Sequence, residues 1–108
     1  MTRGVPGTHN IKEILNTIKK FNKSKYPIKI PIFNKLKDTR REKQKIINKK
    51  ADIIILEGWC CGSPPINIKY LQKNINILEK KFDSKFKWRN YYNNKLKNEY
   101  SELFNKFD

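Results

Sequence analysis

The feature that most constrains the fold is a short aliphatic run near the middle of the chain, Ile53-Ile54-Ile55-Leu56, which ends abruptly at Glu57. Four consecutive apolar residues, three of them β-branched, are typical of a strand buried on both faces, as in a parallel sheet. Such a strand needs a neighbour on each side, because each buried backbone group left unpaired costs roughly 1–3 kcal/mol. We therefore expect an α/β fold with this run as a central strand.

The first half of the chain supplies few neighbours for such a strand. Residues 10–21 predict an amphipathic helix with Asn10 as its N-cap, since apolar residues recur there with helical spacing. Alternating isoleucines over residues 28–32 predict a short strand at the edge of a sheet. Residues 34–50 are highly charged and predict a loop followed by a short helix around residues 42–48.

The second half of the chain predicts only loop and helix. Residues 62–65 carry Gly and two prolines, which are typical of a loop. Apolar spacing then predicts one helix over residues 71–78 and a longer one over residues 88–107, with Asp83 or Ser84 as a cap. Because no second central strand is visible, we expect most lateral partners of the aliphatic run to lie outside these 108 residues.

The composition is strongly basic, with 25 Lys and Arg against 10 Asp and Glu and a net charge of +15. This balance is typical of proteins that bind nucleic acid. Only four of the cations are arginines, however, and the planar arginine fork is the side chain preferred for base and phosphate recognition. Two interpretations of the aromatic side chains in residues 85–92 remain open. They can pack in the core along one face of a helix, or they can stack on the bases of single-stranded RNA. A small nucleic-acid-binding protein is thus the alternative function.

Membrane and export signals are not visible in the sequence. The aliphatic run is far shorter than a membrane span, and Met1 leads into a polar turn rather than an apolar signal segment. Cys60 and Cys61 are adjacent, which suits neither a disulfide nor a zinc site. We expect a cytoplasmic protein with reduced thiols and no membrane partner.

Four stretches of the sequence, taken together and in this order, carry a resemblance to a known family. They are TRGVPGTHN (residues 2–10), IPIFNKLKDTR (residues 30–40), IIILEGWCCG (residues 53–62) and KWRNYYNNKLKNEYSELFNKFD (residues 87–108). The chain resembles the D-glycerate 3-kinase-like P-loop kinases, a family usually described as related to pantothenate kinase.

The resemblance implies a function and an architecture. It implies ATP-dependent, Mg²⁺-assisted phosphoryl transfer to a hydroxyl of a small metabolite such as glycerate, on a three-layer α/β/α P-loop NTPase fold with a parallel sheet. Residues 1–108 would be the middle portion of one such domain, truncated at both ends. No G-x-x-x-x-G-K-[ST] loop occurs in the sequence, so no residue is assigned to bind the nucleotide. We expect the chain alone to be inactive, with a small-molecule substrate as the partner of the complete site. A third hypothesis is a structural or interaction remnant that docks onto a separately encoded P-loop half.

The resemblance also implies site residues. Glu57 would be a catalytic acid that holds Mg²⁺ or its water, in the manner of a Walker-B residue, and Asn10 stands at the position of the catalytic base. The residues expected to contact the substrate are Arg3, His9, Lys35, Arg40 and Trp59.

Three positions depart from the family pattern, because Asn10, Asn34 and Thr39 stand where the family has aspartate. An amide cannot take a proton, so general-base help at Asn10 would be lost. Simpler roles remain open as well. Asn10 can be a plain N-cap, Glu57 can pair with a lysine, and His9 and Trp59 can serve in capping and packing.

Overall fold

The computed structural model describes residues 4–107, which divide into two compact units. We call residues 12–55 the hairpin unit, and residues 4–11 together with 56–107 the helical unit. Each unit is described here by itself. Within the described range, no helix combines the length and the apolar character that crossing a membrane requires.

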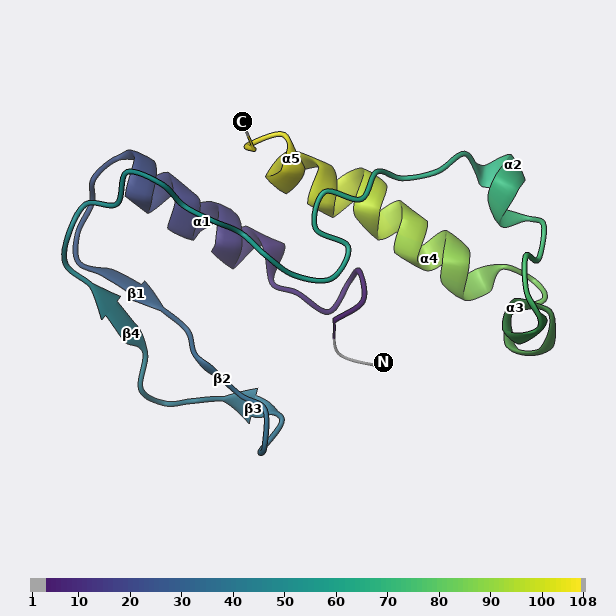
Figure 1. Ribbon diagram of the computed structural model, residues 1–108, viewed down its shortest axis with the longest axis horizontal. Helices are drawn as coiled ribbons and strands as arrows, with labels where there is room; N and C mark the ends of the chain where they lie inside the picture. The colour runs from purple at the N-terminus through teal and green to yellow at the C-terminus, as the bar shows by residue number, and fades with distance from the viewer. Residues whose placement is uncertain (1–3, 108) are drawn as a thin grey trace. The chain divides into compact units, whose positions relative to one another are not determined.

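The hairpin unit contains most of helix α1 (Ile11–Asn22) and a two-stranded arm. Strand β1 (Ile28–Ile30) pairs antiparallel with β4 (Lys45–Ile47), so that Ile28 lies opposite Ile47. Strand β2 (Phe33–Asn34) pairs antiparallel with β3 (Thr39–Arg40) farther along the same arm (Figure 1).

The first helix and the first strand confirm the sequence predictions. Helix α1 carries Glu13 in its first turn and lysines in its last, which complements the helix dipole. In β1, Ile28 is fully buried while Lys29 is exposed, as the alternation predicts. The short helix predicted around residues 42–48 is wrong, because residues 45–47 instead provide the strand that pairs with β1.

The aliphatic run is not a buried strand in the described residues. Ile53, Ile54 and Ile55 belong to no sheet and are 80%, 44% and 85% exposed. The physical reason is that the two sheets in residues 4–107 are both two-stranded and antiparallel, and this segment pairs with neither of them. The parallel P-loop sheet therefore remains a prediction.

The helical unit carries its helices in the second half of the chain. The single helix predicted over residues 71–78 is wrong, because Asn76 begins a new helix: its backbone is extended and its side chain accepts a hydrogen bond from the Glu79 N–H. The long C-terminal helix is confirmed, although it ends at Phe104 rather than at residue 107, and it contains one π-helical turn. The elements are α2 (Ile68–Leu71), α3 (Ile77–Phe82), α4 (Lys87–Lys95), the π-helix η1 (Leu96–Tyr100) and α5 (Ser101–Phe104).

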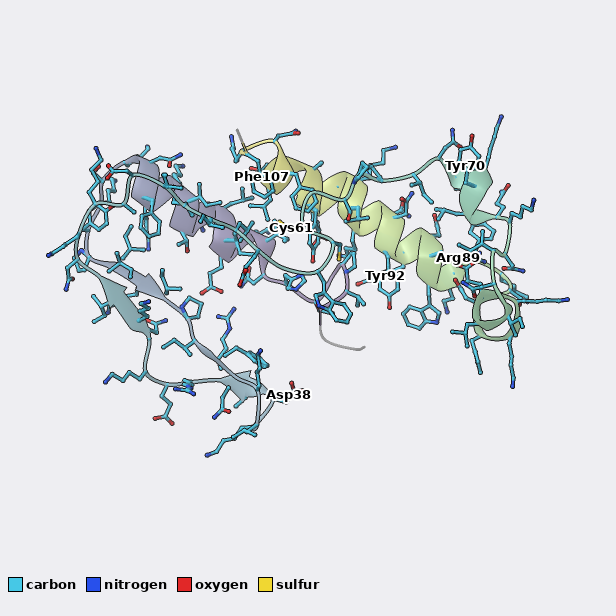
Figure 2. The ribbon with its side chains drawn as sticks, viewed as in Figure 1. Asp38, Cys61, Tyr70, Arg89, Tyr92 and Phe107 are labelled. Atoms are coloured by element: carbon cyan, nitrogen blue, oxygen red, sulfur yellow. The ribbon has the colours of Figure 1, made fainter. Side chains whose placement is uncertain are left out.

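One arginine joins the short helices to the long one. Arg89 lies near the start of α4 (Figure 2). Its guanidinium lies 2.6 Å from the Glu79 carboxylate and 3.1 Å from that of Asp83. It also donates to the Asn74 side chain at 2.6 Å. The N-cap position of α4 is Phe86. Asp83 nevertheless accepts from the backbone N–H groups of Trp88 and Arg89 and so supplies the capping hydrogen bonds that the sequence predicts. The long helix thus begins at a fixed, charge-paired position.

Candidate functional site

The N-terminal loop of residues 4–10 is closed by its own hydrogen bonds. The Thr8 hydroxyl donates to the Val5 carbonyl at 2.7 Å and accepts from the Gly4 N–H at 3.1 Å, and the Thr8 N–H also donates to Val5. The loop leads directly into α1 at Ile11. His9 and Asn10 are exposed at its end. The loop is therefore a defined turn that presents two polar side chains.

Gly7 allows this loop to lie directly against α4. Its φ is +94°, a region that residues with a Cβ rarely adopt. A Cβ at this position would lie 2.9 Å from the Tyr91 hydroxyl oxygen and 3.3 Å from Cγ of Lys95. Glycine is required both by the backbone conformation and by the space available.

The π-helical turn brings a third side chain to the same loop. Tyr91 and Lys95 are four residues apart and share one face of a regular helix, but Tyr100 follows five residues later. The i→i+5 bonding of η1 accommodates that extra residue, so Tyr100 also reaches the loop. π-Turns of this kind occur frequently at functional sites.

Tyr100 is the residue that fastens the loop. It is only 3% exposed, its hydroxyl accepts from the Gly7 N–H at 3.2 Å, and its oxygen lies 2.6 Å from Nδ1 of His9. The two rings meet edge to face. Burial raises the pKa of Tyr100, and this outweighs the opposing hydrogen bonds from the Gly7 and His9 backbones. The phenol is therefore protonated at neutral pH.

The turn after the aliphatic run lies beside the same loop. The Trp59 indole lies over Gly4, where an added Cβ would be 3.7 Å from the ring, and the Cys60 thiol donates to the Gly4 carbonyl at 3.8 Å. Cys60 and Cys61 are free thiols, and burial raises the pKa of Cys60, with a further contribution from Cys61. The helical unit thus brings together the loop, this turn and the long helix.

Glu57 stands at the start of that turn with its carboxylate exposed. Within residues 4–107 it forms no hydrogen bond or ion pair, so the simpler prediction that it pairs with a lysine is not met there. Nor do the described residues contain a group of three or more His, Cys, Asp or Glu side chains able to hold a metal. Glu57 can offer one carboxylate and nothing more.

The hairpin unit holds the other predicted substrate residues. Arg40 lies on β3 and forms an ion pair with Glu13 of α1 at 2.5 Å. Lys35 lies exposed in the turn between β2 and β3. In the same turn Asn34 accepts from the N–H groups of Leu36 and Lys37, a role that aspartate would serve equally well.

The predicted site residues are thus divided between the two units. His9, Asn10, Glu57 and Trp59 belong to the helical unit, whereas Lys35 and Arg40 belong to the hairpin unit. Arg3 lies outside the described residues. Tyr100 was predicted only as part of the apolar stripe of residues 88–107, and Tyr91 only as part of the alternative stacking surface, so neither was predicted to contact the loop. No local pattern in the sequence marks them, because the π-turn that brings Tyr100 to the loop is visible only in the structure.

Comparison with known proteins gives one informative similarity. The chain is 41% identical over 76 residues to a probable ATP-dependent kinase of Saccharomyces cerevisiae, TDA10. This alignment covers 59% of the chain and 25% of the yeast protein, so the chain spans about a quarter of the length of the curated relative that it matches. No protein-family profile matches the chain, and no solved structure does. The similarity supports a relationship to ATP-dependent kinases.

Proposed function

We propose that this chain is part of an ATP-dependent small-molecule kinase of the D-glycerate 3-kinase-like type, which transfers a phosphoryl group from ATP to a hydroxyl of a glycerate-like metabolite. The observation that carries the proposal is the 41% identity to a probable ATP-dependent kinase. The loop of residues 4–10 adds support, because it presents His9 and Asn10 from a turn held against the long helix.

The proposed fold is a parallel-sheet P-loop NTPase in which the aliphatic run becomes a strand. The exposure of Ile53 and Ile55, at 80% and 85%, supports this proposal, since β-branched side chains favour a buried strand when neighbours are present. The neighbours would come from a partner polypeptide that also carries the phosphate-binding loop. Glu57 would then stand at the carboxyl end of a strand, where open α/β sheets bind ligands.

The donor set at Glu57 is compatible with Mg²⁺. Magnesium is usually held by one or two carboxylates together with substrate phosphates and water, so a single exposed carboxylate can contribute one ligand. When bound, the ion neutralises charge on the transferred phosphoryl group. Glu57 would hold the ion or its water.

The remaining site residues would bind and orient the acceptor. Asn10 can hold the acceptor hydroxyl by a hydrogen bond but cannot remove its proton. Trp59 would form a wall of the site beside the loop. The cations proposed to contact anionic groups of the substrates are Arg3, Lys35 and Arg40.

A chimera tests the proposal. In the yeast relative, the matching stretch is replaced by this chain, and ATP-dependent phosphorylation of D-glycerate and of pantothenate is measured. We expect activity toward D-glycerate, and a loss of about 100-fold or more in kcat for Glu57→Gln. Glu42→Gln, which removes another exposed carboxylate, is the matched control. A folded, ATP-binding chimera that phosphorylates neither acceptor would contradict the proposal.

The 108-residue chain alone provides a second test. It contains no G-x-x-x-x-G-K-[ST] loop, the element whose backbone N–H groups cradle the phosphates of ATP. We expect no turnover of ATP with D-glycerate by the purified chain. Turnover would show that the phosphates are bound by other residues.

Nucleic-acid binding is the second candidate and is favoured by the net charge of +15. The aromatic residues proposed for stacking contact one another instead: Trp88 stacks on Tyr92, and Tyr91 meets both rings edge to face. We rank this function second for that reason. RNA binding that weakens steeply as the salt concentration rises would support this function. Binding that does not depend on the salt concentration would exclude it.

A further inference from the structure

The hydrogen bonds around Tyr100 determine which nitrogen of His9 carries a proton. A neutral imidazole has one N–H donor and one bare nitrogen, and the partner of one nitrogen decides the state of the other. Here Nδ1 of His9 lies 2.6 Å from the Tyr100 hydroxyl oxygen. The question is which of these two atoms donates.

The phenol oxygen has one proton and two lone pairs. The Gly7 N–H donates to one lone pair at 3.2 Å, and Tyr100 is only 3% exposed. A buried hydroxyl proton needs an acceptor, and within residues 4–107 Nδ1 of His9 is the sole acceptor in hydrogen-bond contact with this hydroxyl. Tyr100 therefore donates and Nδ1 accepts, which places the proton of the neutral imidazole on Nε2.

The other ring nitrogen of His9, Nε2, forms no hydrogen bond within residues 4–107. His9 is exposed, and among residues 4–107 its only side-chain hydrogen bond is the one to Tyr100. An outward N–H group can donate to an anionic oxygen, whereas it has no lone pair with which to accept a proton. His9 in this state is a binding group and not a general base.

We propose that Tyr100 is a positioning residue that holds His9 as the Nε2–H tautomer, so that His9 donates a hydrogen bond to an anionic oxygen of a small substrate. That the anion belongs to a phosphoryl acceptor or donor rests on the proposed function. The tautomer itself rests only on the contacts of Gly7, His9 and Tyr100, and it can be measured without ATP.

Nuclear magnetic resonance of the full ¹⁵N-labelled chain tests the tautomer. Long-range ¹H–¹⁵N correlations of the His9 ring distinguish a protonated from a bare nitrogen, and the same chain unfolded in urea gives the reference mixture. We expect the neutral ring of His9 in the folded chain to carry its proton on Nε2. Protonation of Nδ1 in the folded chain would overturn the proposal, whatever the kinase assay gives.

Tyr100→Phe removes the hydroxyl and keeps the ring. We expect the His9 tautomer ratio to return to that of the unfolded chain, and the Gly7 amide to exchange faster by about tenfold, the effect of losing one hydrogen bond. Tyr92→Phe, which removes another half-buried tyrosine hydroxyl of the same long helix, is the matched control and should change neither. An unchanged tautomer ratio in Tyr100→Phe would overturn the proposal.

Titration with D-glycerate and with inorganic phosphate tests the donor role. We expect one of these anions to shift the Nε2 resonance of His9 in the wild type, and to bind about tenfold more weakly to Tyr100→Phe. The anion with the larger response identifies the carboxylate or the phosphate as the recognised group. No response of Nε2 to either anion would overturn the donor role.

Discussion

Two isoleucine-rich segments of the hairpin unit have opposite fates. Ile28 in the alternating segment is fully buried, whereas Ile55 in the continuous run is 85% exposed. The sequence pattern predicts the reverse ranking, because a continuous run is the stronger sign of a strand buried on both faces. The difference is that β1 finds its partner β4 within the same unit, while the run has no partner there. Burial follows the presence of a partner, and apolar character alone does not secure it.

The largest effect should come from the segment that has its partner. Ile28→Ala removes a fully buried side chain and should lower the free energy of unfolding of the hairpin unit by about 2–4 kcal/mol. Hydrogen exchange of the β1 and β4 amides measures this loss. Ile46→Ala, at an exposed position of β4, is the control. Equal protection of these amides in the wild type and in Ile28→Ala would contradict the conclusion that the buried, paired segment stabilises the hairpin unit.

The N-terminal loop sharpens the comparison, because its partner lies far away in the sequence. Gly7→Ala introduces a Cβ at positive φ and against the Tyr91 hydroxyl, and should destabilise the helical unit by about 2–3 kcal/mol. Gly62→Ala also has positive φ but meets no atom within 4 Å, so it should cost only about 1 kcal/mol. Chemical denaturation followed by tryptophan fluorescence separates the two. Equal losses would show that the contact with α4 contributes nothing.

The pH dependence of the α4 cap gives a smaller effect. Burial would raise the pKa of Asp83, but hydrogen bonds from the Trp88 and Arg89 backbones and from the Arg89 guanidinium lower it overall. Since the folded-state pKa lies below the unfolded value of about 3.9, this contribution to stability is present above that pH and disappears as the pH falls through the folded pKa. Hydrogen exchange of the Trp88 amide should report it. Asp83→Asn should lack this loss of amide protection at low pH. An identical loss in the variant would show that another group is responsible for it.

The smallest effect should come from the run without a partner. Ile55→Ala should change stability by less than about 0.5 kcal/mol in the 108-residue chain, because the side chain is already in solvent. If the proposed partner polypeptide buries the run, the same substitution should weaken their association much more strongly. Co-purification of the wild type and of Ile55→Ala with a polypeptide that carries the P-loop measures this difference. A large loss of stability in the 108-residue chain alone would contradict the exposed position of Ile55.

The predictions that succeeded are those that depend on local sequence. The periodicity of α1, the alternation in β1 and the capping role of Asp83 are set by residues a few positions apart. The helix predicted around residues 42–48 failed because the pairing of Ile28 with Ile47 decided the conformation, and local composition carries no sign of such pairing.

The candidate site was predictable in part for the same reason. Resemblance to a kinase family identified His9 and Asn10 as residues of interest, and the structure places both at the end of a closed loop. Tyr100, which fastens that loop, is 91 residues from His9, and their contact was not predicted. A contact of that sequence separation requires knowledge of how the loop and the helix pack.

The π-helical turn also limits how the chain can vary in length. Insertion of one more residue between Lys95 and Tyr100 would rotate Tyr100 and every later side chain by about 100° about the helix axis. The phenol would then turn away from the glycine amide, and the imidazole would lose its partner, although no residue in the loop had changed. Deletion of one residue from the same turn would instead restore the four-residue spacing of a regular α-helix and keep the phenol on the face of Tyr91 and Lys95. This turn can therefore lose a residue without releasing the loop, but it cannot gain one.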